Sequence, residues 1–302
     1  MSKHAEQKSQ AREKAAALHA TQLRAERRRR LLLAVGAVAV VLVVIGGLVA
    51  VRLAGGGKKE TAAEPSGSAD SNLISTLASI PAETFAAVGS DGVQAAPAAI
   101  TAPHLLSPDG KPKVLYVGAE FCPYCAAERW PVTVALSRFG TFSNLGTTHS
   151  AAADVYPNTA SLSFHGSTYT SKYLAFTGVE TTTNEEVNGR YAPLDKLTPE
   201  DQKTFDTFNQ PPYVKSSGSI PFVDLGGQFA NAGATFTPEV LAGKTQSEIA
   251  NALKDPANPI AQAIDGSANV YTAALCQLTK NQPAAVCSTD AVKTAAGKLG
   301  RS

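Results

Sequence analysis

The sequence predicts an α/β domain, and three features of the chain indicate this class. A mostly apolar run at 113–118 has the length of a buried strand, and a segment at 126–139 places apolar residues on one helical face shortly after it. Two further strand candidates, 220–225 and 228–230, flank a Gly-Gly pair, which is typical of a β-hairpin. With 44% hydrophobic residues among 302, the chain can bury a substantial core around these elements.

The chain begins with a basic segment and a long apolar run. Residues 1–30 contain nine Lys or Arg and three acidic residues. In the segment 31–53, the first 21 residues carry no charged or strongly polar side chain, which is enough at the helical rise to cross a bilayer. We therefore expect a basic tail at 1–30 followed by one transmembrane helix at 31–53.

The distribution of charge sets the expected orientation in the cell membrane. Residues 27–30 are four arginines, whereas the far side of the apolar segment offers only Arg52, Lys58 and Lys59 nearby. Because basic flanks stay in the cytoplasm, the tail is expected there and the remainder of the chain outside the cytoplasm. A cleaved signal peptide is the alternative, although its apolar region is usually shorter and its charged leader less extended.

The exported part is nearly neutral, with 18 basic and 22 acidic residues in 31–302. Arginines beside a membrane span are explained by topology and by attraction to anionic lipids, so no nucleic-acid function is expected. The chain contains no phosphate-binding loop, hydrolase carboxylate pair or serine triad motif. Residues 54–72, rich in Gly, Ser, Ala and charge, predict a flexible linker ahead of an extracytoplasmic domain at 73–302.

Within that domain, short helices are expected at 73–80 and 82–88, on either side of a proline. The helix at 126–139 is expected to end at a glycine. The region 141–218 turns to Ser, Thr, Asn and Tyr, with alternation at 161–164 and 173–176 that suggests strands. Three N-cap patterns then predict helices that begin after Thr198, Thr245 and Asn258.

Two cysteines separated by two residues, Cys122 and Cys125, stand where the first strand gives way to a helix. A thiol pair at this spacing can open and close a disulfide. The first turn of a helix offers unpaired N–H groups and the positive end of the helix dipole, which favour thiolate at Cys122. We expect Cys122 to be the nucleophile and Cys125 to resolve the mixed disulfide, while Pro123 removes a competing N–H and Tyr124 adds an aromatic edge.

The other two cysteines, Cys276 and Cys287, also lie in the exported part. An even number of cysteines in an oxidising compartment suggests two pairs, and this second pair lacks a helix-starting CxxC arrangement. A structural bridge is expected here, with a second redox pair that relays electrons to the first as the alternative.

The order of strand, CxxC, helix, proline-led hairpin and helix resembles the thioredoxin superfamily. Cys122-Pro123-Tyr124-Cys125 is similar to the glutaredoxin motif, and Ile220-Pro221 looks like the cis-proline that presents backbone to an incoming peptide. Residues 118–121 and 128–131 also resemble a family of membrane-anchored proteins known as domain of unknown function 929, over about 82–287. The resemblance implies a thioredoxin-like fold with an inserted segment at about 141–218.

Two departures from the thioredoxin pattern concern proton transfer and length. Thioredoxins resemble each other in a buried acid six residues before the first cysteine, and this chain has Tyr116 there. Glu120 and Glu128 are the candidates to relay a proton instead. The segment between motif and proline is longer than in a minimal thioredoxin, so it is expected to fold over or beside the site.

Asp224, in the strand after the proline, is expected to be an outward, solvated carboxylate.

The function predicted is that of a membrane-anchored extracytoplasmic thiol-disulfide oxidoreductase. The sequence does not set whether it donates, reduces or isomerises disulfides. Its expected partners are exported proteins with cysteines and a membrane redox carrier, and no cofactor is implied. One alternative is a binding module in which the thiolates hold a soft metal or the fold docks a protein. None of the five histidines is spaced near the motif, so no metal site is expected. In a further alternative, both cysteine pairs are permanent bridges.

Overall fold

The computed structural model describes residues 67–69 and 71–300. The predicted tail 1–30, the predicted transmembrane helix 31–53 and most of the predicted linker 54–72 lie outside the described residues. Within the described ranges, no helix combines the length and apolarity needed to cross a membrane.

A mixed five-stranded sheet forms the centre of the described part, which confirms the α/β class. The strand order is β2-β12-β11-β3-β8. The strand β3 pairs in parallel with β8 and antiparallel with β11, so the apolar run predicted as a strand is an inner strand of the sheet. The strands are β2 (Ala98–Ala99), β3 (Lys113–Gly118), β8 (Ala175–Glu180), β11 (Phe222–Leu225) and β12 (Phe229–Ala232).

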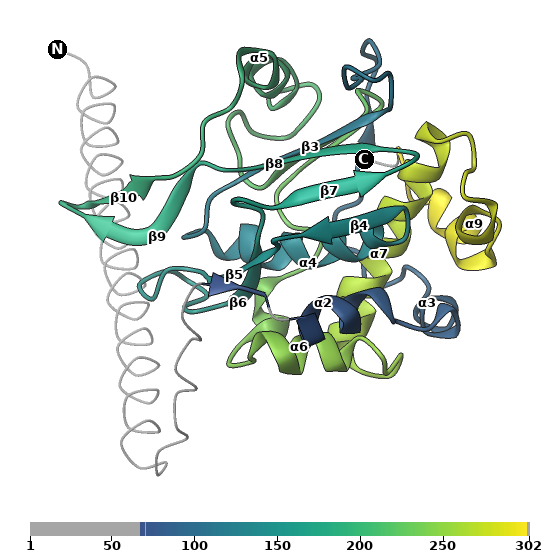
Figure 1. The fold of residues 1–302 in the computed structure, drawn as a ribbon, viewed down its shortest axis with the longest axis horizontal. Helices are drawn as coiled ribbons and strands as arrows, with labels where there is room; N and C mark the ends of the chain where they lie inside the picture. Colours follow the sequence, from purple (N-terminus) through teal and green to yellow (C-terminus); the bar gives the residue numbers. More distant parts are fainter. Residues whose placement is uncertain (1–66, 70, 301–302) are drawn as a thin grey trace, which may run out of the picture. The chain divides into compact units, whose positions relative to one another are not determined.

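Helices cover both faces of this sheet (Figure 1). Alternate residues of β3 face opposite sides because strand side chains have a period of two. Val114 and Tyr116 belong to the same apolar cluster as residues of α4 (Pro123–Ser137) and α7 (Pro259–Leu278). Leu115 and Val117 belong to a second cluster, against which α5 (Pro199–Phe208) packs.

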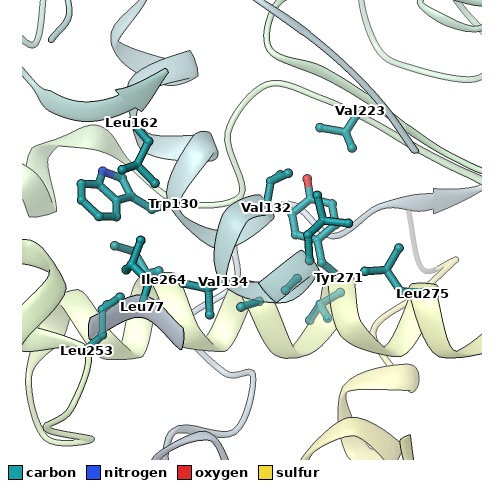
Figure 2. Close-up of a cluster of buried hydrophobic side chains, with 14 of the residues drawn as sticks. Leu77, Trp130, Val132, Val134, Leu162, Val223, Leu253, Ile264, Tyr271 and Leu275 are labelled. Carbon is teal, nitrogen blue, oxygen red and sulfur yellow. The ribbon is translucent and has the colours of Figure 1, made fainter. Parts of the chain in front are cut away.

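The larger cluster lies where α4 crosses α7 (Figure 2). Trp130 of α4 is fully buried, and its indole N–H donates to the carbonyl of Ala160 at 3.1 Å. Tyr271 and Leu275 of α7 meet Val132 of α4 under the sheet (Figure 2). Because two helices and a sheet share these side chains, the position of α4 is fixed along its whole length.

The segment expected to be an insertion, 141–218, is in part a component of the central sheet. It supplies α5, which covers one face of the sheet, and the strand β8. No local sequence pattern reveals that β8 pairs with β3. Its remaining strands form small antiparallel pairs beside the sheet, one of which is joined by residues of the expected linker. The pairs are β4 (Gly140–Ser143) with β7 (Thr168–Ser171), β5 (Gly146–His149) with β6 (Ala160–Ser163) and β1 (Gly67–Ser68), and β9 (Thr182–Val187) with β10 (Arg190–Pro193).

The predicted helix starts are confirmed. Thr198 accepts a hydrogen bond from the backbone N–H of Asp201, Thr245 forms a complete capping box with Glu248, and Asn258 caps α7. The remaining helices are α2 (Ser71–Ala78), α3 (Ala82–Val88), the 3-10 helix η1 (Pro238–Leu241), α6 (Gln246–Ala252), α8 (Ala284–Cys287) and α9 (Asp290–Ala296).

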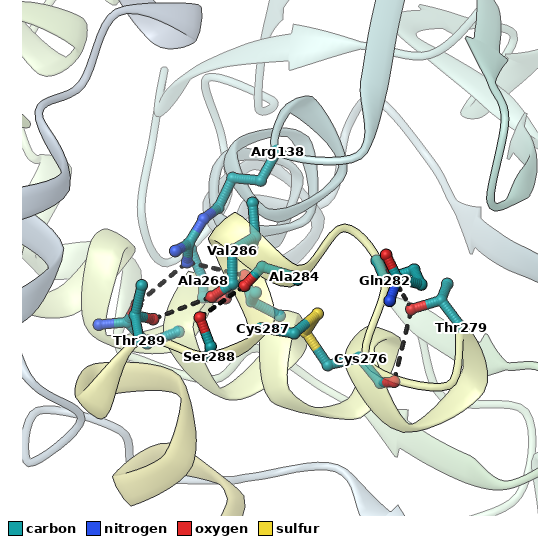
Figure 3. Close-up of a disulfide and its surroundings, with 12 residues drawn as sticks. Arg138, Ala268, Cys276, Thr279, Gln282, Ala284, Val286, Cys287, Ser288 and Thr289 are labelled. Atoms are coloured by element: carbon teal, nitrogen blue, oxygen red, sulfur yellow. Dashed lines mark hydrogen bonds between the residues drawn. A yellow bond between two sulfur atoms is a disulfide. The ribbon is translucent and has the colours of Figure 1, made fainter.

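A disulfide joins the end of α7 to α8, between Cys276 and Cys287 (Figure 3). Both cysteines are buried, and their Cα atoms are 5.6 Å apart. The bridge therefore fixes α8 and the segment after it against the longest helix of the described part.

Replacing both Cys276 and Cys287 by alanine is expected to lower the free energy of unfolding by about 2 to 3 kcal/mol, because a short loop is no longer closed in the unfolded chain. Urea denaturation without reductant measures this loss. The matched control, Cys122→Ala with Cys125→Ala, removes no bridge of the structure and should change stability less. Equal stability of the bridge variant and the wild type would contradict a structural role.

Candidate functional site

The candidate site is the N-terminus of α4. Cys122 is the N-cap residue, with extended φ and ψ of −77° and 121°, and Pro123 opens the helix. The Cys122 sulfur accepts the backbone N–H of Cys125 at 3.3 Å. One of the otherwise unpaired N–H groups of the first turn is therefore directed at this sulfur, which favours its thiolate form.

A second segment reaches the same sulfur from 98 residues away in the sequence. The Ile220–Pro221 peptide bond is cis and stands directly before β11. Pairing of Phe222 with Val117 brings this segment to the end of β3, and the Cys122 thiol donates to the Ile220 carbonyl oxygen at 4.0 Å. The structure thus brings together Cys122 and the predicted peptide-presenting residues.

The two cysteines are free thiols with different surroundings. Cys122 is 6% exposed and Cys125 is fully buried. Hydrogen bonding from the Cys125 thiol, followed by the backbone N–H groups and the Arg129 charge, holds the pKa of Cys122 below its usual value despite burial. Burial, and then its hydrogen bond to Cys122, raises the pKa of Cys125 well above the usual value. Of the two thiols, Cys122 is therefore the one that ionises more readily, and Cys125 is the one that keeps its proton to higher pH.

Tyr116 lies beneath the cysteines, at the position where the thioredoxin resemblance expects an acid. It is fully buried, and its hydroxyl donates to the Cys125 carbonyl at 3.4 Å. Burial raises its pKa well above the usual value, so it remains a neutral donor near pH 7. Tyr116 therefore holds the first turn of α4 in place and does not accept a proton.

A buried ion pair beside the cysteines was not predicted from the sequence. The Arg129 guanidinium donates to both carboxylate oxygens of Glu180, at 2.8 and 2.7 Å, and both side chains are fully buried. Arg129 also donates to the Ala119 carbonyl at 2.8 Å, and that carbonyl accepts the N–H of Cys122. The spacing of four between Cys125 and Arg129 indicates a shared helical face. That Glu180 is the partner of Arg129 depends on the pairing of β8 with β3, and the sequence does not reveal this pairing.

The two candidate proton relays point elsewhere. Glu120 accepts the Ser163 hydroxyl at 2.7 Å. Glu128 is fully buried and accepts the N–H and hydroxyl of Thr235, at 2.7 and 2.9 Å, together with the Tyr271 hydroxyl. Burial raises the pKa of Glu128 to about 7 against the lowering effect of these donors. None of the hydrogen bonds between described residues joins either carboxylate to a cysteine sulfur.

Aromatic residues border the motif. Tyr124 is 41% exposed and meets Tyr156 edge to face, with ring centroids 5.8 Å apart. Phe121, directly before Cys122, stacks on Tyr191 of β10 at 4.2 Å. The β9–β10 hairpin is therefore attached to the lead-in of the motif, as expected for a segment that folds beside the site.

The expectation of a solvated Asp224 is wrong. The side chain is fully buried, because β11 is an inner strand with elements packed on both of its faces. Its position on the α5 face, away from α4, separates it from the cysteines.

In a Cys125→Ala variant, the Cys122 thiol is expected to have a higher pKa than in the wild type. The variant keeps the backbone N–H at position 125 but loses the thiol that contributes most to lowering the Cys122 pKa. The pH dependence of iodoacetamide alkylation, followed by mass spectrometry of the Cys122 peptide, gives both values. A Cys276→Ala/Cys287→Ala variant should alkylate at Cys122 as the wild type does, and an unchanged midpoint in Cys125→Ala would refute the assigned hydrogen bond.

The family described as Domain of unknown function (DUF929) matches residues 99–277 of the chain, which is more than half of its length and includes both CxxC cysteines and the cis-proline. No curated protein and no solved structure matches the chain.

Proposed function

The chain belongs to the family described as Domain of unknown function (DUF929), a description that names no activity, and from its site we propose that it is a thiol-disulfide oxidoreductase. One observation carries the proposal: two free cysteines stand at a helix N-terminus, where the Cys122 sulfur lies beside the Cys125 backbone N–H and the Ile220 carbonyl. This setting lowers the pKa of Cys122, whereas burial raises the pKa of Cys125. A thiolate beside a neutral thiol is the arrangement that attack and resolution require.

The reaction proceeds in two balanced steps. The Cys122 thiolate attacks a substrate disulfide, which forms a mixed disulfide and releases one substrate sulfur as thiolate. Cys125 then gives its proton to a released sulfur and attacks the Cys122 sulfur, which frees the second substrate sulfur. The substrate gains two electrons and the Cys122–Cys125 pair loses them. When the pair starts as a disulfide, a substrate thiolate runs the same steps in reverse.

We also propose that the domain has a thioredoxin-like fold. The order β3, α4, β11, β12 and α7 supports this, because it is the order of strand, CxxC helix, hairpin and helix on which the resemblance rests. The Ile220 carbonyl beside Cys122 supports it further, since an incoming peptide would meet this backbone next to the reactive sulfur.

The proposed place of action is the outer face of the cell membrane. The apolar run at 31–53 would anchor the domain and the linker residues before β1 would tether it, so that the site meets exported proteins with cysteines close to the bilayer. A membrane electron carrier would then reset the pair after each turnover.

Trapping tests the proposed function. The purified full chain carrying Cys125→Ala is incubated with a protein that contains disulfides, such as oxidised insulin, and covalent adducts are sought by non-reducing electrophoresis and mass spectrometry. We expect adducts on Cys122, because the resolving thiol is gone, whereas the wild type should reduce insulin without accumulating them.

The matched controls separate exchange from adventitious oxidation. Cys122→Ala/Cys125→Ala should trap nothing, and Cys276→Ala/Cys287→Ala should keep the activity of the wild type. Adducts that persist without Cys122, or a wild type that neither reduces insulin nor forms disulfides in a reduced substrate, would end the proposal.

A further inference from the structure

A pocket lies on the face of the sheet opposite α4, between α5, the turn after β11 and the segment 103–105. Its volume is about 330 Å³, at the small end of the range of roughly 300–1,000 Å³ for pockets that bind small molecules. Leu105 and Phe208 supply apolar walls, and the exposed residues Lys203 and Thr207 of α5 stand at its rim.

This pocket is separate from the cysteine site. Asp224, which lines it, pairs with Leu115 in the first half of β3, whereas Cys122 follows the other end of that strand. Alternation along β11 places Asp224 on the same face as Phe222, which packs against Phe205 of α5. A ligand in the pocket would therefore not touch the proposed redox pair.

The polar group in the pocket is an incompletely paired carboxylate. Asp224 is fully buried, and its Oδ1 accepts the N–H of Gly227 at 2.8 Å. Its Oδ2 has no hydrogen-bond partner among the described residues. Burial raises the pKa of Asp224 to about 7, so the carboxylate is costly to keep charged in the empty pocket. Oδ2 is itself buried at the wall of the pocket, so a donor that reaches it there would satisfy it.

The nearby cations of the chain are engaged elsewhere or stand apart. Lys113, on the same face of β3, is bound to Asp201 of α5 at 2.5 Å. Lys203 forms no ion pair with Asp224 among the described residues. The part of the chain that the structure describes also holds no group of three His, Cys, Asp or Glu side chains that could bind a metal ion. His104, which also lines the pocket, donates no hydrogen bond to Oδ2 of Asp224 among the described residues. A ligand can therefore supply the missing donor.

We propose that this pocket binds a small organic cation, a primary amine with an apolar body, whose ammonium group donates to Oδ2 of Asp224 while its body packs against Leu105 and Phe208. The ammonium supplies both the hydrogen bond and the charge that the carboxylate lacks, and charge-assisted hydrogen bonds are the stronger ones. This site adds a binding activity to the domain and does not depend on the proposed redox function.

Benzylamine is the probe, and benzyl alcohol is its uncharged counterpart of similar size. Binding to the full chain is measured by isothermal titration and by ligand-observed NMR at pH 8, where the carboxylate is ionised and the amine is protonated. We expect saturable binding of benzylamine, with benzyl alcohol at least 10-fold weaker.

Two variants and a control test the assignment. Asp224→Asn keeps an acceptor for Gly227 but loses the charge, and Thr207→Trp fills the pocket from its exposed rim without altering Asp224. Each should weaken binding at least 10-fold, whereas Asp206→Asn, an exposed acid of α5 outside the pocket, should not. If the wild type does not bind benzylamine saturably, or if Thr207→Trp or Asp224→Asn binds it as the wild type does, the proposal is wrong.

Discussion

The chain carrying Arg129→Met is expected to lose about 3 to 5 kcal/mol of unfolding free energy, because the substitution leaves the Glu180 carboxylate buried without its partner. Both side chains are 0% exposed, so water cannot replace the guanidinium. Among the residues that the structure describes, only the backbone N–H of Phe164, at 3.3 Å, would still donate to this carboxylate. The variant should also release the Ala119 carbonyl that Arg129 holds next to Cys122.

A second substitution separates this cause from lost packing. Arg129→Met combined with Glu180→Met removes both charges and retains apolar bulk, so most of the lost stability should return. Removing one partner of an exposed pair, by Lys298→Met opposite Asp91, should leave stability nearly unchanged. Urea denaturation of the four proteins measures these differences, and a double variant as unstable as Arg129→Met alone would refute the explanation by an unpaired charge.

Glu128→Gln is expected to alter how stability depends on pH. Burial raises the native pKa of Glu128 to about 7 from an ordinary value of 4.5. Between these two values the native state holds a proton that the unfolded chain has lost, so this group makes stability fall as pH rises through that window. The fall amounts to about 3 kcal/mol, and above pH 7 the group contributes no further change.

Glutamine has no such titration and keeps an oxygen that can accept hydrogen bonds from Thr235 or Tyr271. The stability of Glu128→Gln relative to the wild type should therefore rise by about 3 kcal/mol between pH 4.5 and pH 8. Urea denaturation at several pH values tests this, with the exposed Glu239→Gln as control, whose curve should run parallel to that of the wild type. Parallel curves for Glu128→Gln and the wild type would show that the native pKa of Glu128 is not raised above its value in the unfolded chain.

The sequence was informative where structure depends on neighbouring residues. The caps at Thr198, Thr245 and Asn258 are local hydrogen bonds between residues two or three apart, so their residue types sufficed. The strand before Cys122 and the hairpin before α7 were visible as apolar runs and turn glycines. The meeting of Cys122 with Ile220 came from a resemblance, since nothing local in either segment indicates the other.

The sequence was less informative where structure depends on distant pairing. Glu180 lies 51 residues from Arg129, and only the parallel pairing of β8 with β3 brings them together. Asp224 reads as a surface carboxylate, because one strand alone does not show that it will be an inner one. Glu128 could be placed on the CxxC helix, but its direction toward Tyr271 of α7 depends on how two helices pack.

The position of β8 limits how far this protein could be shortened to a smaller scaffold. Excising 141–218 as one block would uncover the edge of β3, and an uncovered strand edge is a template for aggregation. The β9–β10 hairpin pairs with itself beside the central sheet and could be trimmed at little cost to that sheet. A minimised version would therefore shorten the small hairpins one at a time and keep β8 and α5.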